Sequence, residues 1–210
     1  MSEDRYFSDD PVDGSPEAPD LLGRHDYAGH LAKLLDAVRA QSESSVMALV
    51  GSWGSGKSSV LAMAIRELQT TSGSNGWLIA EFNPWMQSDL ESLLAGFFAE
   101  LREALPKDRK WKETRKKIGE FGKSVSPLGK LGSLVGVDGS EIAKAMSTLI
   151  GGDTSATATK KKAEEALREL RRPILMVVDD LDRLTPHELL LVFKLVRLVG
   201  RLPNVYYLLC

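Results

Sequence analysis

Two short segments of the sequence carry residue types that could bind and transform a phosphate compound. The first is GSWGSGKSS (residues 51–59), which places Gly51, Gly56, Lys57 and Ser58 at the spacing of a phosphate-binding loop. Glycines let the backbone wrap closely enough for several N–H groups to point at one anion, and a helix that follows adds its partial positive charge. A Gly-rich turn without a ligand is the alternative. The candidate phosphate-contacting residues are Gly51, Ser52, Trp53, Gly54, Ser55, Gly56, Lys57, Ser58 and Ser59.

Lys57 and Ser58 are the side chains of this loop that chemistry would use. We expect Lys57 to reach the β and γ phosphates of a nucleotide and to serve in catalysis. We expect the hydroxyl of Ser58 to ligate Mg²⁺. The first segment therefore predicts a nucleotide site with a divalent cation.

The second segment is VVDDLDRL (residues 177–184), where acidic residues directly follow an apolar run. An open parallel sheet places its ligand at the carboxyl ends of its strands, so Asp179 is the candidate for a second Mg²⁺ contact. Asp180 is the candidate general base that orients or deprotonates the attacking water, with a solvated helix cap as the alternative. For Asp182 and Arg183, an ion pair or a helix-start cap explains the sequence as well as a nucleotide role does.

The elements that must position these residues follow from apolar periodicity. Short apolar runs at residues 46–50, 77–83, 174–178 and 205–210 predict strands, and the run at 46–50 is typical of a strand covered on both faces. Residues 21–40, 57–70, 88–105, 163–170 and 186–200 predict helices, and Ser88 with Glu91 predicts a capping box for the third of these. Strands and helices thus alternate, which predicts an α/β fold with a doubly wound, mainly parallel sheet.

Two regions differ in composition from this core. Residues 1–20 are acidic and contain three prolines, which predicts a disordered leader before a core at 21–210. Residues 106–162 form a basic and Gly/Ser-rich segment, which predicts a helical insertion into that core. A solvated excursion is the simplest interpretation of the insertion. The alternatives are contact with a membrane surface or with a partner.

Composition narrows the class of protein. The 210 residues carry a net charge of -2, so no global basic excess indicates nucleic acid as the main partner. The single cysteine, Cys210, excludes an intrachain disulfide and fits a reducing compartment. No apolar stretch is long enough for a spanning helix. We therefore expect a cytoplasmic location, with peripheral membrane contact through residues 106–162 as an extension.

The phosphate loop, the acidic segment and the intervening FNPW (residues 82–85), in this order, resemble the KAP family of P-loop NTPases in the STAND branch. The resemblance implies a P-loop NTPase core in which residues 51–59 are the Walker A loop and Asp179 and Asp180 belong to Walker B. It implies that LLGR (residues 21–24) lies against the adenine through Arg24, with a surface charge as the alternative. For FNPW we expect core packing of Trp85 and an Asn83 that reaches toward the γ-phosphate.

The resemblance also implies a function. We expect a Mg²⁺-dependent ATPase that acts as a signalling switch through self-association or a downstream effector, of a kind found in bacterial signalling and anti-phage defence. The alternative is a catalytically weak nucleotide-binding module that recruits a partner or a membrane surface. A small-molecule kinase is a third interpretation, although no arginine-rich lid is visible. Because the family's sensor residue and later arginine are not seen before Cys210, the core is expected to be truncated on its C-terminal side.

Overall fold

The computed structural model describes residues 10–39, 44–71, 76–87, 89–125 and 154–210. The chain divides into two compact units. One combines Met1–Ala40 with Val50–Gly76, and the other combines Gln41–Leu49 with Trp77–Cys210. The phosphate loop belongs to the first unit and the acidic segment to the second.

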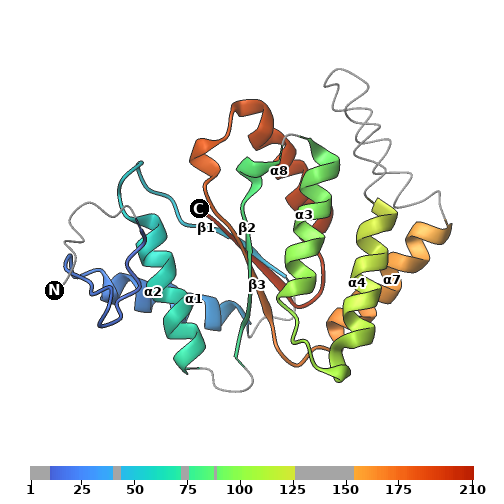
Figure 1. The fold of residues 1–210 in the computed structure, drawn as a ribbon, viewed down its shortest axis with the longest axis horizontal. Helices are drawn as coiled ribbons and strands as arrows, with labels where there is room; N and C mark the ends of the chain where they lie inside the picture. Colours follow the sequence, from blue (N-terminus) through green and yellow to red (C-terminus); the bar gives the residue numbers. More distant parts are fainter. Residues whose placement is uncertain (1–9, 40–43, 72–75, 88, 126–153) are drawn as a thin grey trace. The chain divides into compact units, whose positions relative to one another are not determined.

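The second unit is built on a parallel sheet of four strands (Figure 1). The strands are β1 (Val46–Ala48), β2 (Leu78–Phe82), β3 (Ile174–Val178) and β4 (Val205–Leu209). Their order is β1-β4-β3-β2, and all three pairings are parallel. This confirms the expected α/β class with a mainly parallel sheet. All carboxyl ends of the strands consequently meet at one edge, where the acidic segment follows β3.

The continuous apolar sequences of β3 and β4 follow from their burial. Every residue of β3 and β4 is buried, as expected for central strands of a parallel sheet. β1 differs, since it is an end strand of the described sheet and Val46 remains 46% exposed. The expectation that residues 46–50 are covered on both faces is therefore wrong for β1. A continuous apolar run does not distinguish a central strand from an edge strand.

One face of the sheet packs against α3 (Leu90–Glu103) and α8 (Pro186–Val199) (Figure 1). Alternate residues of β2, β3 and β4 enter a core with the apolar faces of these helices. Phe97 of α3 stacks on Tyr207 of β4 at a centroid distance of 6.2 Å. Burial raises the pKa of Tyr207 well above its usual value, so its hydroxyl stays protonated and donates to the Val199 carbonyl.

Two helices that connect β2 to β3 extend this core. The short η4 (Arg109–Trp111) leads into α4 (Lys112–Val125), and α7 (Thr154–Arg168) returns toward β3. α4 packs against both α3 and α7, with Ile118 and Phe121 buried. The ring of Phe121 meets Phe98 of α3 edge to face at 5.1 Å. α4 is therefore part of the core, in contrast to the solvated excursion expected for residues 106–162, of which 126–153 lie outside the described residues.

The first unit contains α1 (His25–Arg39) and α2 (Lys57–Thr71), which pack together. Residues 10–20 pack on α2, in contrast to the disordered leader expected over 1–20. The Val12 N–H donates to Ser59 Oγ at 3.1 Å, and Gly14 approaches Met63 so closely that a Cβ there would lie 3.4 Å from its side chain. Backbone hydrogen bonds and turn contacts order this acidic segment although it buries little apolar surface. Residues 1–9 lie outside the described part.

Helix boundaries follow local capping chemistry. α8 begins at a complete capping box of Thr185 and Glu188. Hydrogen bonds from Thr185 hold the pKa of Glu188 below its usual value, against an opposing effect of desolvation. α3 begins at Asp89, whose carboxylate accepts the Ser92 N–H at 2.9 Å, so the expectation of Ser88 as its cap is wrong. Both residues are good N-caps, and the sequence alone does not decide between neighbours.

Candidate functional site

The phosphate loop has the backbone that its glycines predict. Gly54 and Gly56 have φ values of 73° and 83°, a left-handed conformation that glycine adopts without strain. The Ser55 N–H donates to the Ser52 carbonyl at 3.1 Å, which closes a turn inside the loop. Position 51 also requires glycine, because a Cβ there would lie only 2.7 Å from Ser55 Oγ. The sequence GSWGSGKS thus dictates a tight curved loop.

The loop delivers its reactive side chains to the start of α2. Lys57 is the first residue of that helix and donates from Nζ to the Gly51 carbonyl at 3.4 Å, across the mouth of the loop. Ser58 and Ser59 occupy the next two positions, where helix N–H groups have no partner within the helix. Trp53 at the tip is 83% exposed. This arrangement can bind an anion through backbone N–H donors, an ammonium group and the positive end of a helix.

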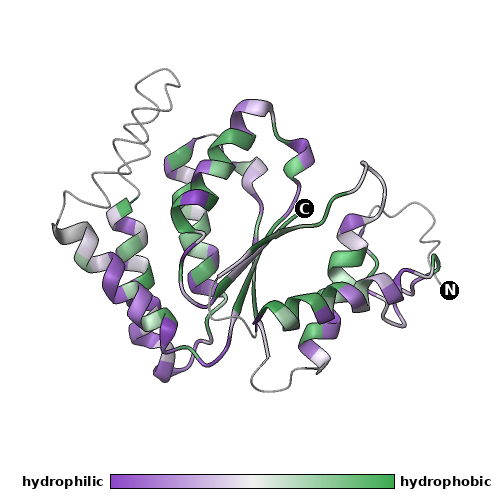
Figure 2. Ribbon diagram, turned by 180° about the vertical axis from the view of Figure 1, so that it is seen from behind, coloured by the Kyte–Doolittle hydropathy of each residue, from purple (hydrophilic) through white to green (hydrophobic). Residues whose placement is uncertain are grey.

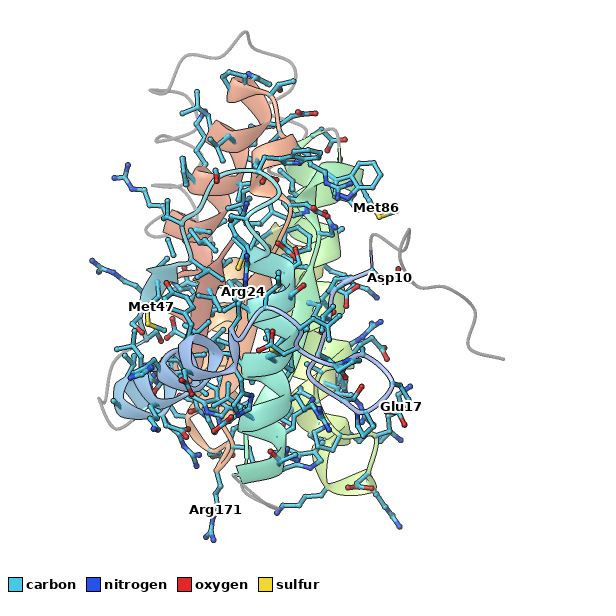
Figure 3. All side chains as sticks on the ribbon, turned by 90° about the vertical axis from the view of Figure 1, so that its left-hand side faces the viewer. Asp10, Glu17, Arg24, Met47, Met86 and Arg171 are labelled. Carbon is cyan, nitrogen blue, oxygen red and sulfur yellow. The ribbon has the colours of Figure 1, made fainter. Side chains whose placement is uncertain are left out.

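Arg24 lies at the phosphate loop (Figure 3). Its guanidinium donates to the Ser55 carbonyl and fills the space that a Cβ on Gly56 would take. The hydrogen bond joins residues 31 positions apart in the sequence. Arg24 therefore contributes a cation to the loop itself, a contact that the LLGR segment did not indicate.

The acidic segment begins where β3 ends. Phe82 and Val178 are partners in the β2–β3 register, so the residues that follow them, Asn83 and Asp179, stand side by side at the carboxyl edge. The Asp179 N–H donates to the Phe82 carbonyl at 3.3 Å. The Asp180 N–H donates to Asp179 Oδ1 at 2.8 Å. Asp180 has φ 61°, an uncommon left-handed conformation for a residue with a side chain.

The carboxylate of Asp180 is held from two sides. Asn83 Nδ2 donates to Asp180 Oδ2 at 2.7 Å, and Arg183 Nε lies 2.7 Å from Oδ1. The carboxylate is 21% exposed, whereas Arg183 is 57% exposed. Asn83 Oδ1 is buried without a hydrogen-bond partner among the described residues. We call these three residues the Asp180 clamp. The contact between Asp180 and Arg183 is the ion pair that the sequence left as one alternative for Arg183.

The structure differs from the sequence-based expectations for the acidic edge at two residues. Trp85 lies in the short η3 (Pro84–Met86) and is 48% exposed, so the interpretation of core packing is wrong, and Pro84 is the buried residue of that turn. Sequence reasoning also missed Asn83 as a partner of Asp180. The available signal was its position directly after a strand, because Asn83 and Asp179 follow neighbouring strands of one sheet.

Each of the two units contains a side-chain oxygen of the kind that Mg²⁺ uses. The described part of the chain contains no group of three or more His, Cys, Asp or Glu side chains that could enclose a metal ion. Mg²⁺ does not require such a cage, since it is commonly bound through one or two protein oxygens, phosphate oxygens and waters. The Ser58 hydroxyl in the first unit and the Asp179 carboxylate in the second are each a donor of this kind.

A parallel sheet with a glycine loop before α2 and an acidic pair after β3 defines a P-loop NTPase domain. The chain belongs to the KAP family, because residues 24–210 match the KAP family P-loop domain. The chain is also similar to the Phage T7 exclusion protein of Escherichia coli (strain K12), with 27% identity over 226 aligned residues. That alignment covers 96% of this chain and 30% of the relative. No solved structure matches.

The chain therefore spans less than a third of the length of this curated relative. None of the helices in the described part of the chain combines the length and the apolar character needed to cross a membrane.

Proposed function

We propose that this domain binds ATP with Mg²⁺ and hydrolyses it, and that this nucleotide cycle controls a signalling switch. The observation that carries the proposal is the phosphate loop, with two left-handed glycines directly before a helix that begins at Lys57. A loop of this kind can turn several backbone N–H groups and the Lys57 ammonium toward a single anion. Membership of a P-loop NTPase family supports the same ligand class.

Different residues of the loop are proposed to contact different parts of the nucleotide. Backbone donors from Gly51 to Ser59 are proposed to hold the phosphates, and Lys57 to reach the β and γ groups. For that, Lys57 Nζ exchanges its weak 3.4 Å contact with the Gly51 carbonyl for a phosphate oxygen. Arg24 adds a second cation beside Ser55 and Gly56. The proposed role of Arg24 is thus on the phosphate side of the nucleotide.

Ser58 and Asp179 are the proposed Mg²⁺ ligands, and the cation supplies charge neutralisation at the phosphates when bound. Asp180 is the proposed general base that takes a proton from the attacking water. Asn83 is a positioning residue, because its amide donor fixes Asp180 Oδ2 at 2.7 Å. Each carboxylate oxygen keeps a second lone pair, so the clamp orients Asp180 without using up its capacity to accept a proton.

The biological setting is proposed from the curated relative. The name of that relative describes exclusion of phage T7, which supports a role of this domain in anti-phage defence. A switch of this kind responds to the γ-phosphate, the only group that distinguishes ATP from ADP. We propose that the ATP-bound state promotes self-association or engagement of an effector.

A catalytically weak nucleotide-binding module is the second candidate, and the Asp180 clamp favours it. Arg183 neutralises the proposed base at 2.7 Å and Asn83 occupies its other oxygen. Both carboxylate oxygens already accept from protein groups, so fewer of their lone pairs remain for an attacking water. The two candidates agree on nucleotide binding and differ in turnover.

The test measures Mg²⁺-dependent binding of ATP, ADP and a non-hydrolysable ATP analogue by calorimetry, with phosphate release followed in the same samples. Lys57→Ala is expected to weaken ATP binding by at least about tenfold, the loss of one strong charge-assisted contact. Asp180→Asn is expected to keep ATP affinity and lose turnover. Unchanged affinity in Lys57→Ala would contradict the site. Tight binding by the wild type without phosphate release would favour the module.

A further inference from the structure

The α4–α7 region concentrates positive charge in a chain that is acidic as a whole. Residues 107–125 and 154–172 contain fourteen Lys and Arg and only six Asp and Glu, a net charge of +8, whereas the complete chain carries -2. The rest of the chain is therefore at -10. Such segregation exceeds what solubility requires, because mixed charges serve solubility equally well.

Many of these cations have no ion-pair partner among the described residues. Among the described residues, the ion pairs of the region involve Lys107, Lys116, Lys160 and Arg168, and Arg115 donates to backbone carbonyls. Seven further cations are exposed and make no ion pair with any residue that the structure describes. One of them, Lys123, lies near the end of α4, and we call the other six the basic surface: Arg109, Lys110, Lys112, Lys161, Lys162 and Arg171.

The packing of the two helices turns these cations outward. α4 and α7 lie side by side and run in opposite directions, so the start of α4 and the end of α7 are neighbours (Figure 1). Ile118, Phe121, Ala163 and Leu167 point into the core. Hydrophilic residues predominate in this region (Figure 2), and the cations of the basic surface are exposed. The basic surface is thus carried by α4 and α7, by the short η4 before α4 and by the bend after α7, and not by a loose tail.

Stability does not account for these charges. Lys112 and the cations of η4 (Arg109 and Lys110) lie at the start of α4, where Glu113 is the acidic residue of the first turn. The positive end of the helix dipole disfavours cations at that position. Lys110 has a compensating contact, since its ammonium lies 5.1 Å from the centre of the Trp111 ring. Arg109 and Lys112 oppose the local preference without an ion-pair partner among the described residues, which is typical of functional surfaces.

We propose that the basic surface binds the phosphate backbone of a nucleic acid. A helix held at a membrane surface needs large apolar side chains that enter the lipid. Among the described residues, none of the large exposed hydrophobic side chains lies between 107 and 172. A phosphate backbone needs only cations at its surface, and binding is driven by release of counterions. The inference does not depend on ATP binding by the phosphate loop.

The test is fluorescence anisotropy of a labelled mixed-sequence DNA duplex with the complete chain, titrated at several KCl concentrations. The wild type is expected to bind with affinity that falls steeply with salt. The triple variant Arg109→Glu, Lys112→Glu and Lys162→Glu is expected to bind at least about tenfold more weakly. Its plot of log affinity against log salt should be shallower by about 2 to 3, because each lost phosphate contact removes about 0.9.

A matched control reverses three exposed cations elsewhere, as Lys33→Glu, Arg197→Glu and Arg201→Glu, and should bind within about twofold of the wild type. Lys57→Ala should also retain duplex binding, which separates this surface from the phosphate loop. If the charge-reversal variant does not fold by circular dichroism, Lys112→Gln with Lys162→Gln serves instead and should still reduce affinity.

Three results would overturn the proposal. The first is a wild type that does not bind the duplex at low salt. The second is an equal loss of affinity in the variant and in the matched control, which would make the effect one of net charge. The third is binding to phosphatidylcholine vesicles that contain phosphatidylserine without binding to the duplex, which would assign the surface to a membrane.

Discussion

Gly54 and Gly56 form a matched pair that tests whether Arg24 is packed on the phosphate loop. Both glycines have a left-handed backbone, with φ values of 73° and 83°. A Cβ on Gly54 would meet no atom within 4 Å, whereas a Cβ on Gly56 would collide with the Arg24 guanidinium. Alanine at either position shares the backbone strain, and only alanine at Gly56 displaces Arg24.

The expected losses follow from these two contributions. A left-handed residue other than glycine costs about 1 to 2 kcal/mol, which is the expected loss in the free energy of unfolding for Gly54→Ala. Gly56→Ala adds the hydrogen bond from Arg24 to the Ser55 carbonyl, worth about 1 kcal/mol for a partly exposed pair. In an Arg24→Ala background, Gly56→Ala should cost no more than Gly54→Ala, a coupling of about 1 kcal/mol.

The assay is urea unfolding followed by far-UV circular dichroism on the wild type and on single and double variants, so that a thermodynamic cycle closes. Equal losses for the two glycines in the wild-type background would refute the packing of Arg24 on Gly56. So would a loss for Gly56→Ala that stays the same after Arg24→Ala. Either result would leave Arg24 as a surface cation.

Three further predictions concern the clamp, the core and a helix cap. Asn83→Ala removes the donor that positions Asp180, so phosphate release should fall by about 10- to 100-fold at unchanged ATP affinity, and an unaltered rate would exclude that role. Phe121→Ala should lower the free energy of unfolding in urea by about 3 to 5 kcal/mol, because its ring is only 4% exposed, and a loss below about 1 kcal/mol would place α4 outside the core. The lowered pKa of Glu188 means that its link to Thr185 stabilises the fold above the carboxyl pKa of the unfolded chain and is lost as pH falls through the folded-state pKa. The stability difference between the wild type and Glu188→Ala should therefore shrink on acidification, and a difference independent of pH would contradict this assignment.

The loop and the strands were predictable because their signals are local. Gly54 and Gly56 adopt positive φ, as the phosphate-loop spacing implies, and the α/β alternation is borne out by a parallel sheet. Errors arose where a local pattern has two solutions. Neighbouring residues can both cap a helix, as with Ser88 and Asp89, and an apolar run suits a central or an edge strand, as with β1.

Burial of apolar side chains in residues 107–125 was not predictable from composition. Residues 107–125 read as a basic, soluble segment because eight of them are Lys or Arg. Their few apolar residues nevertheless fall at helical spacing, and Ile118, Phe121 and Val125 all reach the core beside α3. A narrow apolar stripe is sufficient to dock a helix when a complementary surface such as Phe98 is available.

The sequence by itself determined the class of this protein, since the phosphate loop, the acidic pair after an apolar run and the alternation of elements depend on near neighbours in the chain. The tertiary structure alone decided which distant side chains meet. Asn83 and Asp180 are 97 positions apart and become partners because β2 and β3 are adjacent and in register. Arg24 reaches Ser55 across 31 positions. Spacing along the chain dictates backbone conformation, whereas strand order and helix packing dictate contacts between segments, and these depend on the whole core.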